Sequence, residues 1–375
     1  MKDAREREKA GKRFMEQKRL SDIGWGEFQK MGLTGKGEYL NHRQRPVHTL
    51  LAQQFDRPML ERLCDLATKI RTIARTRGGM QFLQTLLSEK RAMLYFAQPS
   101  TRTFLSFYTA CQTLGVKPAE VRDTTTSSEV KGESPEDTVR TFSSFVDMII
   151  MRHPVGGFAE RIAWLLSHTD REVPVLNAGS GKDQHPTQAL LDIYTLQQGF
   201  DGRGGIDGKT VLFVGDLARG RTVRSLAWLL TCYEGVRALF VAPEPLQIRE
   251  DVLRQLDRAG MPYEIGTDFE RFIPEADAIY MTRIQDEWDV SDESKTLNVE
   301  KYFFTRDHLP MLKRDAILMH PLPRRREIDA EVDADPRAYY WRQVRNGMWI
   351  RTALILLTFQ REAEVDRYYE DLTRE

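Results

Sequence analysis

Short apolar runs alternate with helical stretches in both halves of this chain, and this alternation restricts the fold more than any other feature. Runs of this length are typical of buried strands, and the stretches between them have helical spacing of apolar residues. The predicted strands are residues 92–96, 120–123, 146–151 and 173–178 in the first half, and 210–214, 238–242, 278–281 and 316–319 in the second. Alternating strands and helices indicate an α/β fold with a parallel sheet. We therefore predict two doubly wound parallel-sheet domains.

The length of 375 residues fits two domains of roughly 100–200 residues each. We place the first at residues 46–188, completed by the C-terminal helix within 345–375, and the second at 189–344. The closing helix itself is predicted over residues 342–362. Residues 1–45 stand apart, since they hold 12 Lys and Arg against 7 Asp and Glu. We expect this extension to be frayed or docked on the surface, with a partner-binding arm as the alternative.

The balance of charge excludes several classes of partner. Lys and Arg together number 55, as do Asp and Glu, so no overall field would recruit nucleic acid or a membrane. No apolar run approaches the ~18 residues of a transmembrane helix, and the first residues lack the apolar core of a signal peptide. Cys64, Cys111 and Cys232 are odd in number and far apart, which favours free thiols in a reducing compartment. We predict a cytoplasmic protein.

Ser100-Thr101-Arg102-Thr103 stands where a strand passes into a helix. Pro99 ends the strand, and helical spacing then continues to Gly115, a suitable residue to follow a helix. The first turn of a helix has unpaired N–H groups and a dipole that favours an anion. Three hydroxyls and a guanidinium, which can bind phosphate through two nitrogens, add donors. An ordinary helix cap beside a surface Arg is the alternative, and the tetrapeptide alone does not decide between them.

Other polar residues also follow predicted strands, at the edge where open α/β sheets bind their ligands. They are Arg152, His185 and Gln188 in the first half, and Arg221, Arg283 and Gln285 in the second. In His320-Pro321-Leu322-Pro323 the two prolines prevent a helix and leave the carbonyls of Pro321 and Leu322 free to accept hydrogen bonds. Together these residues predict a crevice that binds anions. No cluster of His and Cys has the spacing of zinc ligands, so we expect no metal or other cofactor.

Several motifs in this set resemble those of the aspartate/ornithine carbamoyltransferase family, and within it the aspartate branch. The motifs are Ser100-Thr101-Arg102-Thr103, Lys131-Gly132-Glu133, Met151-Arg152-His153-Pro154, His185-Pro186-Thr187-Gln188, Gly220-Arg221-Thr222, Thr282-Arg283-Ile284-Gln285 and His320-Pro321-Leu322-Pro323-Arg324. They follow the family's order over residues 46–365. The ornithine branch differs in the last motif, where a cysteine takes the place of Pro321.

The resemblance implies which residues would bind carbamoyl phosphate. The phosphate would be held by Ser100, Thr101, Arg102, Thr103 and Arg152. The carbamoyl oxygen would be polarised by Thr103, Arg152 and His185, which together with Arg102 form the implied catalytic set. The carbamoyl amine would be bound by Gln188 and the carbonyls of Pro321 and Leu322. Ser127 and Lys131 would come from a neighbouring subunit, since the resemblance implies a homotrimer with shared active sites; any higher assembly or regulatory subunit stays open.

The resemblance also implies an aspartate site, formed by Arg221, Arg283, Gln285, Leu322 and Lys131. The implied reaction transfers the carbamoyl group to the amine of L-aspartate, in de novo pyrimidine biosynthesis. The substrate's amine is the nucleophile and phosphate is the leaving group, so the protein has only to align the substrates and stabilise charge. Alignment alone can contribute ~7–11 kcal/mol. The alternatives are a transcarbamylase for a different anionic amino acid and a non-catalytic structural or regulatory paralogue.

Four residues depart from the family's usual pattern: Gln98, Phe104, Tyr108 and Trp288. Phe104 and Tyr108 are one helical turn apart, so we predict an aromatic pair where the family has an ion pair. Gln98 and Trp288 replace charged residues, and we expect them to affect how the two domains close.

Overall fold

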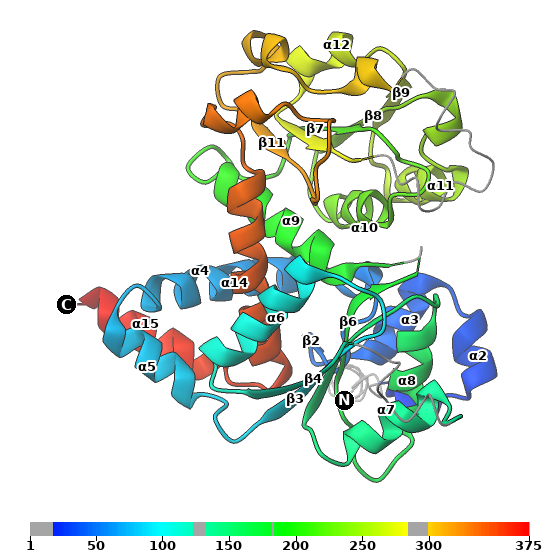
Figure 1. Ribbon diagram of the computed structural model, residues 1–375, viewed down its shortest axis with the longest axis vertical. Coiled ribbons are helices and arrows are strands. Elements are labelled where there is room, and N and C mark those ends of the chain that lie inside the picture. The colour runs from blue at the N-terminus through cyan, green and yellow to red at the C-terminus, as the bar shows by residue number, and fades with distance from the viewer. Residues whose placement is uncertain (1–17, 123–131, 182–183, 284–298, 375) are drawn as a thin grey trace, which may run out of the picture.

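The computed structural model describes residues 18–122, 132–181, 184–283 and 299–374. Two parallel sheets form separate lobes (Figure 1). The first sheet has the order β4-β3-β5-β6, with β3 at Arg91–Phe96, β4 at Lys117–Val121, β5 at Met148–His153 and β6 at Val175–Ser180. The second has the order β11-β10-β7-β8-β9, with β7 at Thr210–Val214, β8 at Arg237–Val241, β9 at Tyr263–Gly266, β10 at Ala278–Met281 and β11 at Ile317–Met319. The predicted α/β class with two parallel sheets is confirmed.

Helices cover both faces of each sheet. The first lobe contains α4 (Arg57–Ile73), α5 (Arg77–Thr85), α6 (Thr101–Thr113), α7 (Pro135–Ser143), α8 (Phe158–Ser167) and α9 (Pro186–Gly199). The second contains α10 (Arg221–Leu230), α11 (Glu250–Ala259) and α12 (Phe269–Phe272), and the chain ends in α14 (Tyr340–Thr358) and α15 (Glu362–Arg374). Alternate strand residues face opposite ways: Leu94 joins the core under α4, α6 and α9, whereas Tyr95 packs toward α7 and α8.

Strand boundaries differ from the prediction where a strand contains polar residues or where its residues are exposed. β5 continues through Arg152 and His153. Arg152 therefore lies inside the strand, whereas we predicted that it follows the strand. β4 begins at Lys117, three residues earlier than expected. β9 was not predicted, because its residues are only partly buried or exposed at the edge of the sheet and therefore form no apolar run.

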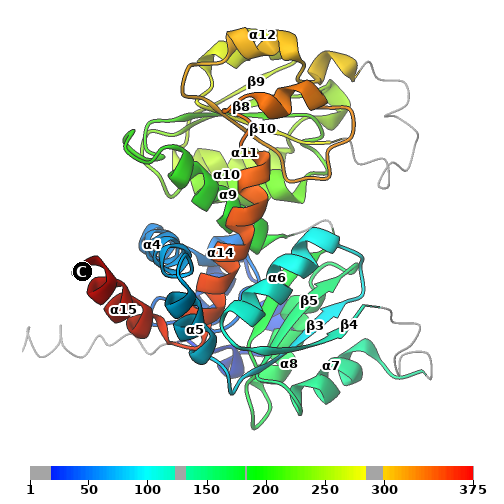
Figure 2. The ribbon, with the colours of Figure 1, turned by 60° about the vertical axis from the view of Figure 1, so that its left-hand side comes forward.

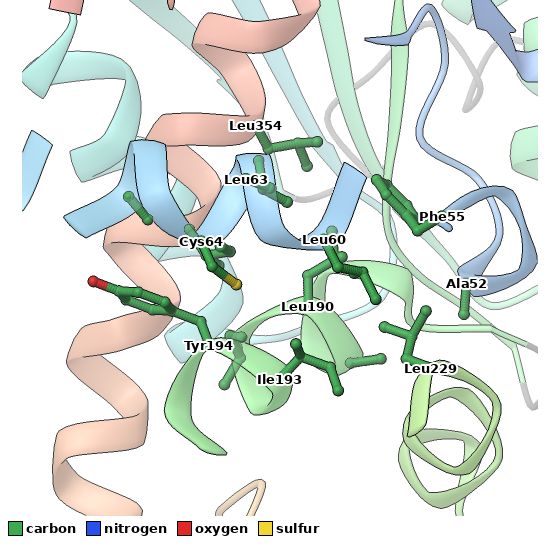
Figure 3. Close-up of a cluster of buried hydrophobic side chains, with 14 of the residues drawn as sticks. Ala52, Phe55, Leu60, Leu63, Cys64, Leu190, Ile193, Tyr194, Leu229 and Leu354 are labelled. Carbon is green, nitrogen blue, oxygen red and sulfur yellow. The ribbon is translucent and has the colours of Figure 1, made fainter. Parts of the chain in front are cut away.

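The helix α14 connects the lobes. It packs against α4, α6 and α9 in the first lobe and contacts β11 in the second. Figure 3 shows Leu60, Leu63 and Leu354 in the apolar cluster that α4, α9 and α14 share with Leu229 of α10. This cluster forms a continuous core through both lobes.

The predicted single helix over residues 342–362 is wrong, because the chain breaks between α14 and α15. Gln360 has a φ of 58°, in the left-handed region that a right-handed helix cannot continue through. After this break α15 packs along α4, where Asp366 pairs with Arg62 and Lys69 (Figure 2).

The described part of the N-terminal segment, residues 18–45, is docked on the first lobe. It contains the short helices α2 (Trp25–Lys30) and α3 (Leu33–Leu40) and the two-residue strands β1 (Asn41–His42) and β2 (Arg45–Pro46). Ile23 and Phe28 are buried, and the Ile23 carbonyl accepts a hydrogen bond of 2.7 Å from Trp164 Nε1. Lys36 pairs with Glu160 of α8 at 2.5 Å. Residues 18–45 therefore follow the docked form of the two that the sequence left open, frayed or docked.

All three cysteines are free, as the sequence predicts. Cys64 and Cys111 are buried free thiols, and Cys232 is a half-buried one. Within the ranges that the structure describes, none of the helices combines the length and apolar character needed to span a lipid bilayer.

Candidate active site

A cavity of about 460 Å³ lies between the lobes, beside the carboxyl ends of the central strands. All predicted site residues that the structure describes line it: Ser100, Thr101, Arg102, Thr103, Arg152, His185, Gln188, Arg221, Arg283, Pro321 and Leu322. Ser127, Lys131 and Gln285 lie outside the described residues. The cavity thus brings together side chains that are more than 200 residues apart in the sequence.

The segment Ser100 to Thr103 forms the start of α6. Ser100 occupies the cap position, but in the described part of the chain its side chain makes no capping hydrogen bond to the helix. The ordinary cap that the sequence left as an alternative is therefore not formed. The segment faces the cavity with its hydroxyls and the first turn of a 13-residue helix, an arrangement suited to an anion.

Arg152 extends from β5 into the middle of this cluster. Its Nη1 donates to the carbonyl of Ala178 at 3.2 Å, which fixes one side of the guanidinium. Burial, followed by the positive charges of Arg221 and Arg102, lowers the pKa of Arg152 to about 9. Clustered cations repel one another, and an anion bound among them relieves this repulsion.

His185 caps the position before α9, with Pro186 as the first helical residue. The imidazole is almost fully buried, and its Nδ1 has no hydrogen-bond partner among the described residues. Burial and the charges of Arg221 and Arg152 keep the pKa of His185 well below its usual value. The ring is thus neutral near pH 7 and can offer one N–H to a developing negative charge.

The second lobe supplies two further guanidinium groups. Arg221 begins α10, and its Nη1 donates to the carbonyl of Gly181 in the first lobe. Arg283 follows β10 by two residues. Burial and the charge of Arg283 lower the pKa of Arg102, so these two guanidiniums from different lobes are near each other across the cavity. An anion with two charged ends, bound between these two guanidiniums, could pair with both and offset their repulsion.

The loop after β11 carries the carbonyls of Pro321 and Leu322. His320 holds this loop: its backbone N–H donates to Gln343 Oε1 at 2.9 Å, its Nδ1 accepts from the Leu322 N–H at 2.7 Å, and its Nε2 lies 2.9 Å from Glu327 Oε1. The peptide between Leu322 and Pro323 is cis. The sequence motif included His320 but did not predict this anchoring role.

Several cavity residues were not predicted from the sequence, Arg351 and Ser106 among them. The Arg351 guanidinium is buried and donates to Ser106 Oγ at 2.8 Å and to Thr187 Oγ1 at 3.3 Å. Burial lowers its pKa to about 9. Arg351 is the one charged residue in the apolar run 349–357, and this was a signal that could have identified it. Among the described residues, no group of three or more His, Cys, Asp or Glu side chains is placed to hold a metal ion.

Three of the four residues that depart from the family pattern are described by the structure: Gln98, Phe104 and Tyr108. The rings of Phe104 and Tyr108 are 5.7 Å apart, which confirms the predicted aromatic pair, and Arg122 stacks on Phe104 at 4.3 Å. Gln98 lines the cavity, and its Oε1 is buried without a partner among the described residues. Trp288 lies outside the described residues, so the effect of the pair on domain closure stays a prediction.

Gly179→Ala should lower kcat/KM by about 100-fold, the order expected for a displacement of roughly 1 Å at a site of this kind. A Cβ at Gly179 would lie 2.6 Å from Arg152 Nη1, at a φ of +118° that other residues rarely adopt. Gly202→Ala is the matched control, since Gly202 also has a positive φ but no atom within 4 Å of the added Cβ. Steady-state kinetics and thermal unfolding of both variants measure the effect; equal activities would contradict it.

Comparisons with known proteins match both lobes. The family model described as aspartate/ornithine carbamoyltransferase, carbamoyl-P binding domain, matches residues 47–198, and the Asp/Orn binding domain model matches residues 207–358. A chloroplastic aspartate carbamoyltransferase of Arabidopsis thaliana is 41% identical over 311 residues, covering 81% of this chain and 76% of that protein. The catalytic subunit of aspartate carbamoyltransferase from Vibrio cholerae is 43% identical over 274 residues, covering 72% of this chain and 86% of that protein.

Solved structures agree. The aspartate transcarbamoylase of Trypanosoma cruzi, in complex with carbamoyl phosphate and aspartate, superimposes with a TM-score of 0.74 at 34% identity, over 82% of this chain and 95% of that one. The catalytic subunit of M. jannaschii aspartate transcarbamoylase gives a TM-score of 0.73 at 36% identity, over 84% and 99%.

Proposed function

Because the chain belongs to the aspartate/ornithine carbamoyltransferase family, we propose that it transfers the carbamoyl group of carbamoyl phosphate to the amine of L-aspartate, giving N-carbamoyl-L-aspartate and phosphate. One observation supports this most directly. The same cavity is lined by a cluster of hydroxyls and cations from the first lobe and by Arg221 and Arg283 from the second. The related enzyme of Trypanosoma cruzi was solved with both carbamoyl phosphate and aspartate. This reaction belongs to de novo pyrimidine biosynthesis.

Carbamoyl phosphate binds to the first lobe in this proposal. Its phosphate binds to the first turn of α6 and to the guanidiniums of Arg102 and Arg152; none of the described residues that line the cavity is acidic. Its carbonyl oxygen is directed at Thr103, Arg152 and His185. Its amine donates to Gln188 and to the carbonyls of Pro321 and Leu322, all of which line the same cavity.

Aspartate completes the site from the second lobe. Its two carboxylates pair with Arg221 and Arg283, which belong to different elements of that lobe, and Gln285 and Lys131 add to this set. The neutral aspartate amine then attacks the carbamoyl carbon and forms the new carbon–nitrogen bond. The carbon–oxygen bond to phosphate breaks, and phosphate leaves with the electron pair and takes up the proton that the amine nitrogen loses. Arg152, Thr103 and His185 stabilise the negative charge that grows on the carbonyl oxygen between these events.

Domain limits and location remain part of the proposal. The carbamoyl phosphate domain comprises residues 46–188 with the C-terminal helix, and the aspartate domain residues 189–344. A cytoplasmic location rests on the free thiols and on the charge pattern, whereas relatives from plants are named chloroplastic. No cofactor takes part in the proposed reaction.

The test is an assay of the purified chain with carbamoyl phosphate and a panel of amino acids. L-aspartate should give equal amounts of carbamoylaspartate and phosphate, and a chelator should not change the rate. Product with ornithine but not aspartate would overturn the proposal. If only another anionic amino acid gives product, the chain is the alternative transcarbamylase. If none of the amino acids gives product, the result favours a non-catalytic paralogue.

We further propose a homotrimer in which Ser127 and Lys131 act in the site of the neighbouring subunit. Lys131→Ala and His185→Ala chains should each be inactive, and trimers that contain both should recover activity, because some sites receive an intact residue from each chain. Dissociation, mixing and reassociation, followed by an activity assay and native mass spectrometry, measure this. Mixed trimers without any recovery would place Lys131 in its own subunit's site.

A further inference from the structure

The Asp192 carboxylate lies at the junction of the two lobes, in the middle of α9, with no exposed surface. Its Oδ1 accepts hydrogen bonds from Gln188 Nε2 at 2.9 Å and from Gln343 Nε2 at 2.6 Å. Its Oδ2 accepts from the Tyr280 hydroxyl at 2.8 Å. One buried group therefore connects the helices α9 and α14 to β10 of the second sheet.

This contact determines which end of the Gln188 amide is available to the cavity. The NH2 group is bound to Asp192, so the Oε1 acceptor is left for the cavity that Gln188 lines. If the amide turned over, Oε1 would lie against a carboxylate oxygen, and two acceptors would repel each other. The carboxylate therefore selects one of two orientations that an isolated glutamine would populate.

The same carboxylate reaches the loop after β11 through Gln343. Because Gln343 donates to Asp192 with its NH2 group, its Oε1 remains to accept the His320 N–H at 2.9 Å. His320 in turn binds the Leu322 N–H. Both the Gln188 oxygen and the Pro321 and Leu322 carbonyls are thus oriented from one point.

We propose that Asp192 is the positioning residue for the amine end of carbamoyl phosphate: it directs acceptors, and only acceptors, toward the NH2 group. The inference rests on the proposed function and deepens it. A carbamoyl NH2 group donates hydrogen bonds, whereas the methyl group of the similarly shaped acetyl phosphate does not. Asp192 is thereby also a determinant of the choice between these two acyl phosphates.

Burial of this carboxylate is costly. Burial raises the pKa of Asp192 to about 7, against the opposing effect of its three hydrogen bonds and the positive charge of Arg351. The neutral acid still has a carbonyl oxygen that can accept, so the orienting role does not require ionisation. An isosteric amide should then substitute for it: the asparagine Oδ1 accepts from both glutamines, and its Nδ2 donates to a Tyr280 hydroxyl that has turned.

The alternative is a purely structural role, in which Gln188 and Asp192 form an ordinary helical pair four residues apart. The two roles differ in what they predict for ligands. A structural defect weakens carbamoyl phosphate and acetyl phosphate alike. Lost orientation weakens carbamoyl phosphate and leaves acetyl phosphate nearly unchanged.

The experiment compares Asp192→Ala, Asp192→Leu and Asp192→Asn with the wild type. The Ala variant should lose about 100-fold in kcat/KM for carbamoyl phosphate, the order of a displacement of roughly 1 Å. Its affinity for acetyl phosphate and for inorganic phosphate, from competitive inhibition or calorimetry, should stay close to that of the wild type. Asp192→Asn should recover most of the loss. Asp192→Leu fills the space without an acceptor and serves if the Ala variant does not fold.

Two further comparisons separate the outcomes. Tyr280→Phe removes the third hydrogen bond to Asp192, together with the contacts of the Tyr280 hydroxyl with Thr222 and Gln188, but keeps both hydrogen bonds from the glutamines to Asp192 and should have a small effect. Asp192→Ala in a Gln188→Leu background should cost less than Asp192→Ala alone, because only the orientation through Gln343 is left to lose. Equal weakening of carbamoyl and acetyl phosphate, or an Asn variant as impaired as Ala, would overturn the inference. If the wild type does not turn over, the proposed function fails, but the ratio of binding affinities for the two acyl phosphates still tests Asp192.

Discussion

Arg152→Leu is expected to lower kcat by about 100- to 1,000-fold, the loss typical of removing one donor to a developing oxyanion. Leucine keeps most of the buried volume but has no donor for the carbonyl oxygen. The loss should be large because none of the described residues that line the cavity is acidic, so the charge of Arg152 is not neutralised there and acts on the carbonyl oxygen. Part of the effect should also appear as weaker phosphate binding.

Steady-state kinetics at saturating aspartate, with calorimetry of phosphate binding, measure the two parts of this effect. Arg75→Leu is the control, because Arg75 is an exposed arginine of the same lobe outside the cavity. The kcat of Arg152→Lys should lie between those of Arg152→Leu and the control, since lysine keeps the charge but loses the planar, two-point geometry. A kcat within tenfold of the wild type for Arg152→Leu would remove Arg152 from the transition-state role.

Arg283→Ala should abolish efficient use of aspartate while carbamoyl phosphate still binds. Loss of one partner of a desolvated charge pair costs about 2–5 kcal/mol, or roughly 30- to 5,000-fold in kcat/KM for aspartate. The two substrates should respond differently because Arg283 follows β10 of the second lobe, whereas the phosphate site begins at α6 of the first.

Calorimetry with phosphate, together with a rate curve for aspartate, separates the two affinities. Arg258→Ala on α11 is the matched control, since it removes an exposed arginine from the same lobe. An equal loss for both substrates would contradict the assignment of Arg283 to aspartate.

Much of the fold was predictable because its signals are local. The central strands are buried on both faces and form nearly continuous apolar runs, which identified β3, β7 and β10 to within a residue. β9 was missed because an edge strand is only partly buried. The break at Gln360 was missed because glutamine is a good helix former, so nothing in the local sequence indicates a left-handed residue there.

In the candidate site, too, residues with a local sequence signal were predicted and residues without one were not. Ser100 to Thr103, Arg152 and His185 stand beside strand and helix boundaries that a sequence pattern can locate. Asp192 and Gln343 could not be predicted, because they are 151 positions apart and their role exists only once α9 and α14 are packed together. Within its own helix Asp192 is one polar residue among apolar neighbours, and Gln343 is one of several polar residues in the first turns of α14.

The position of α14 has a consequence for synthesis on the ribosome. The helix fills a groove of the first lobe between α4, α6 and α9, yet residues 340–358 are translated after the whole second sheet. While the second lobe is being made, apolar residues such as Leu63, which Figure 3 shows beside Leu354, have no cover from α14. The first lobe therefore cannot complete its core until α14 has been translated. A chain that stalls before residue 340 exposes an apolar groove that chaperones can bind.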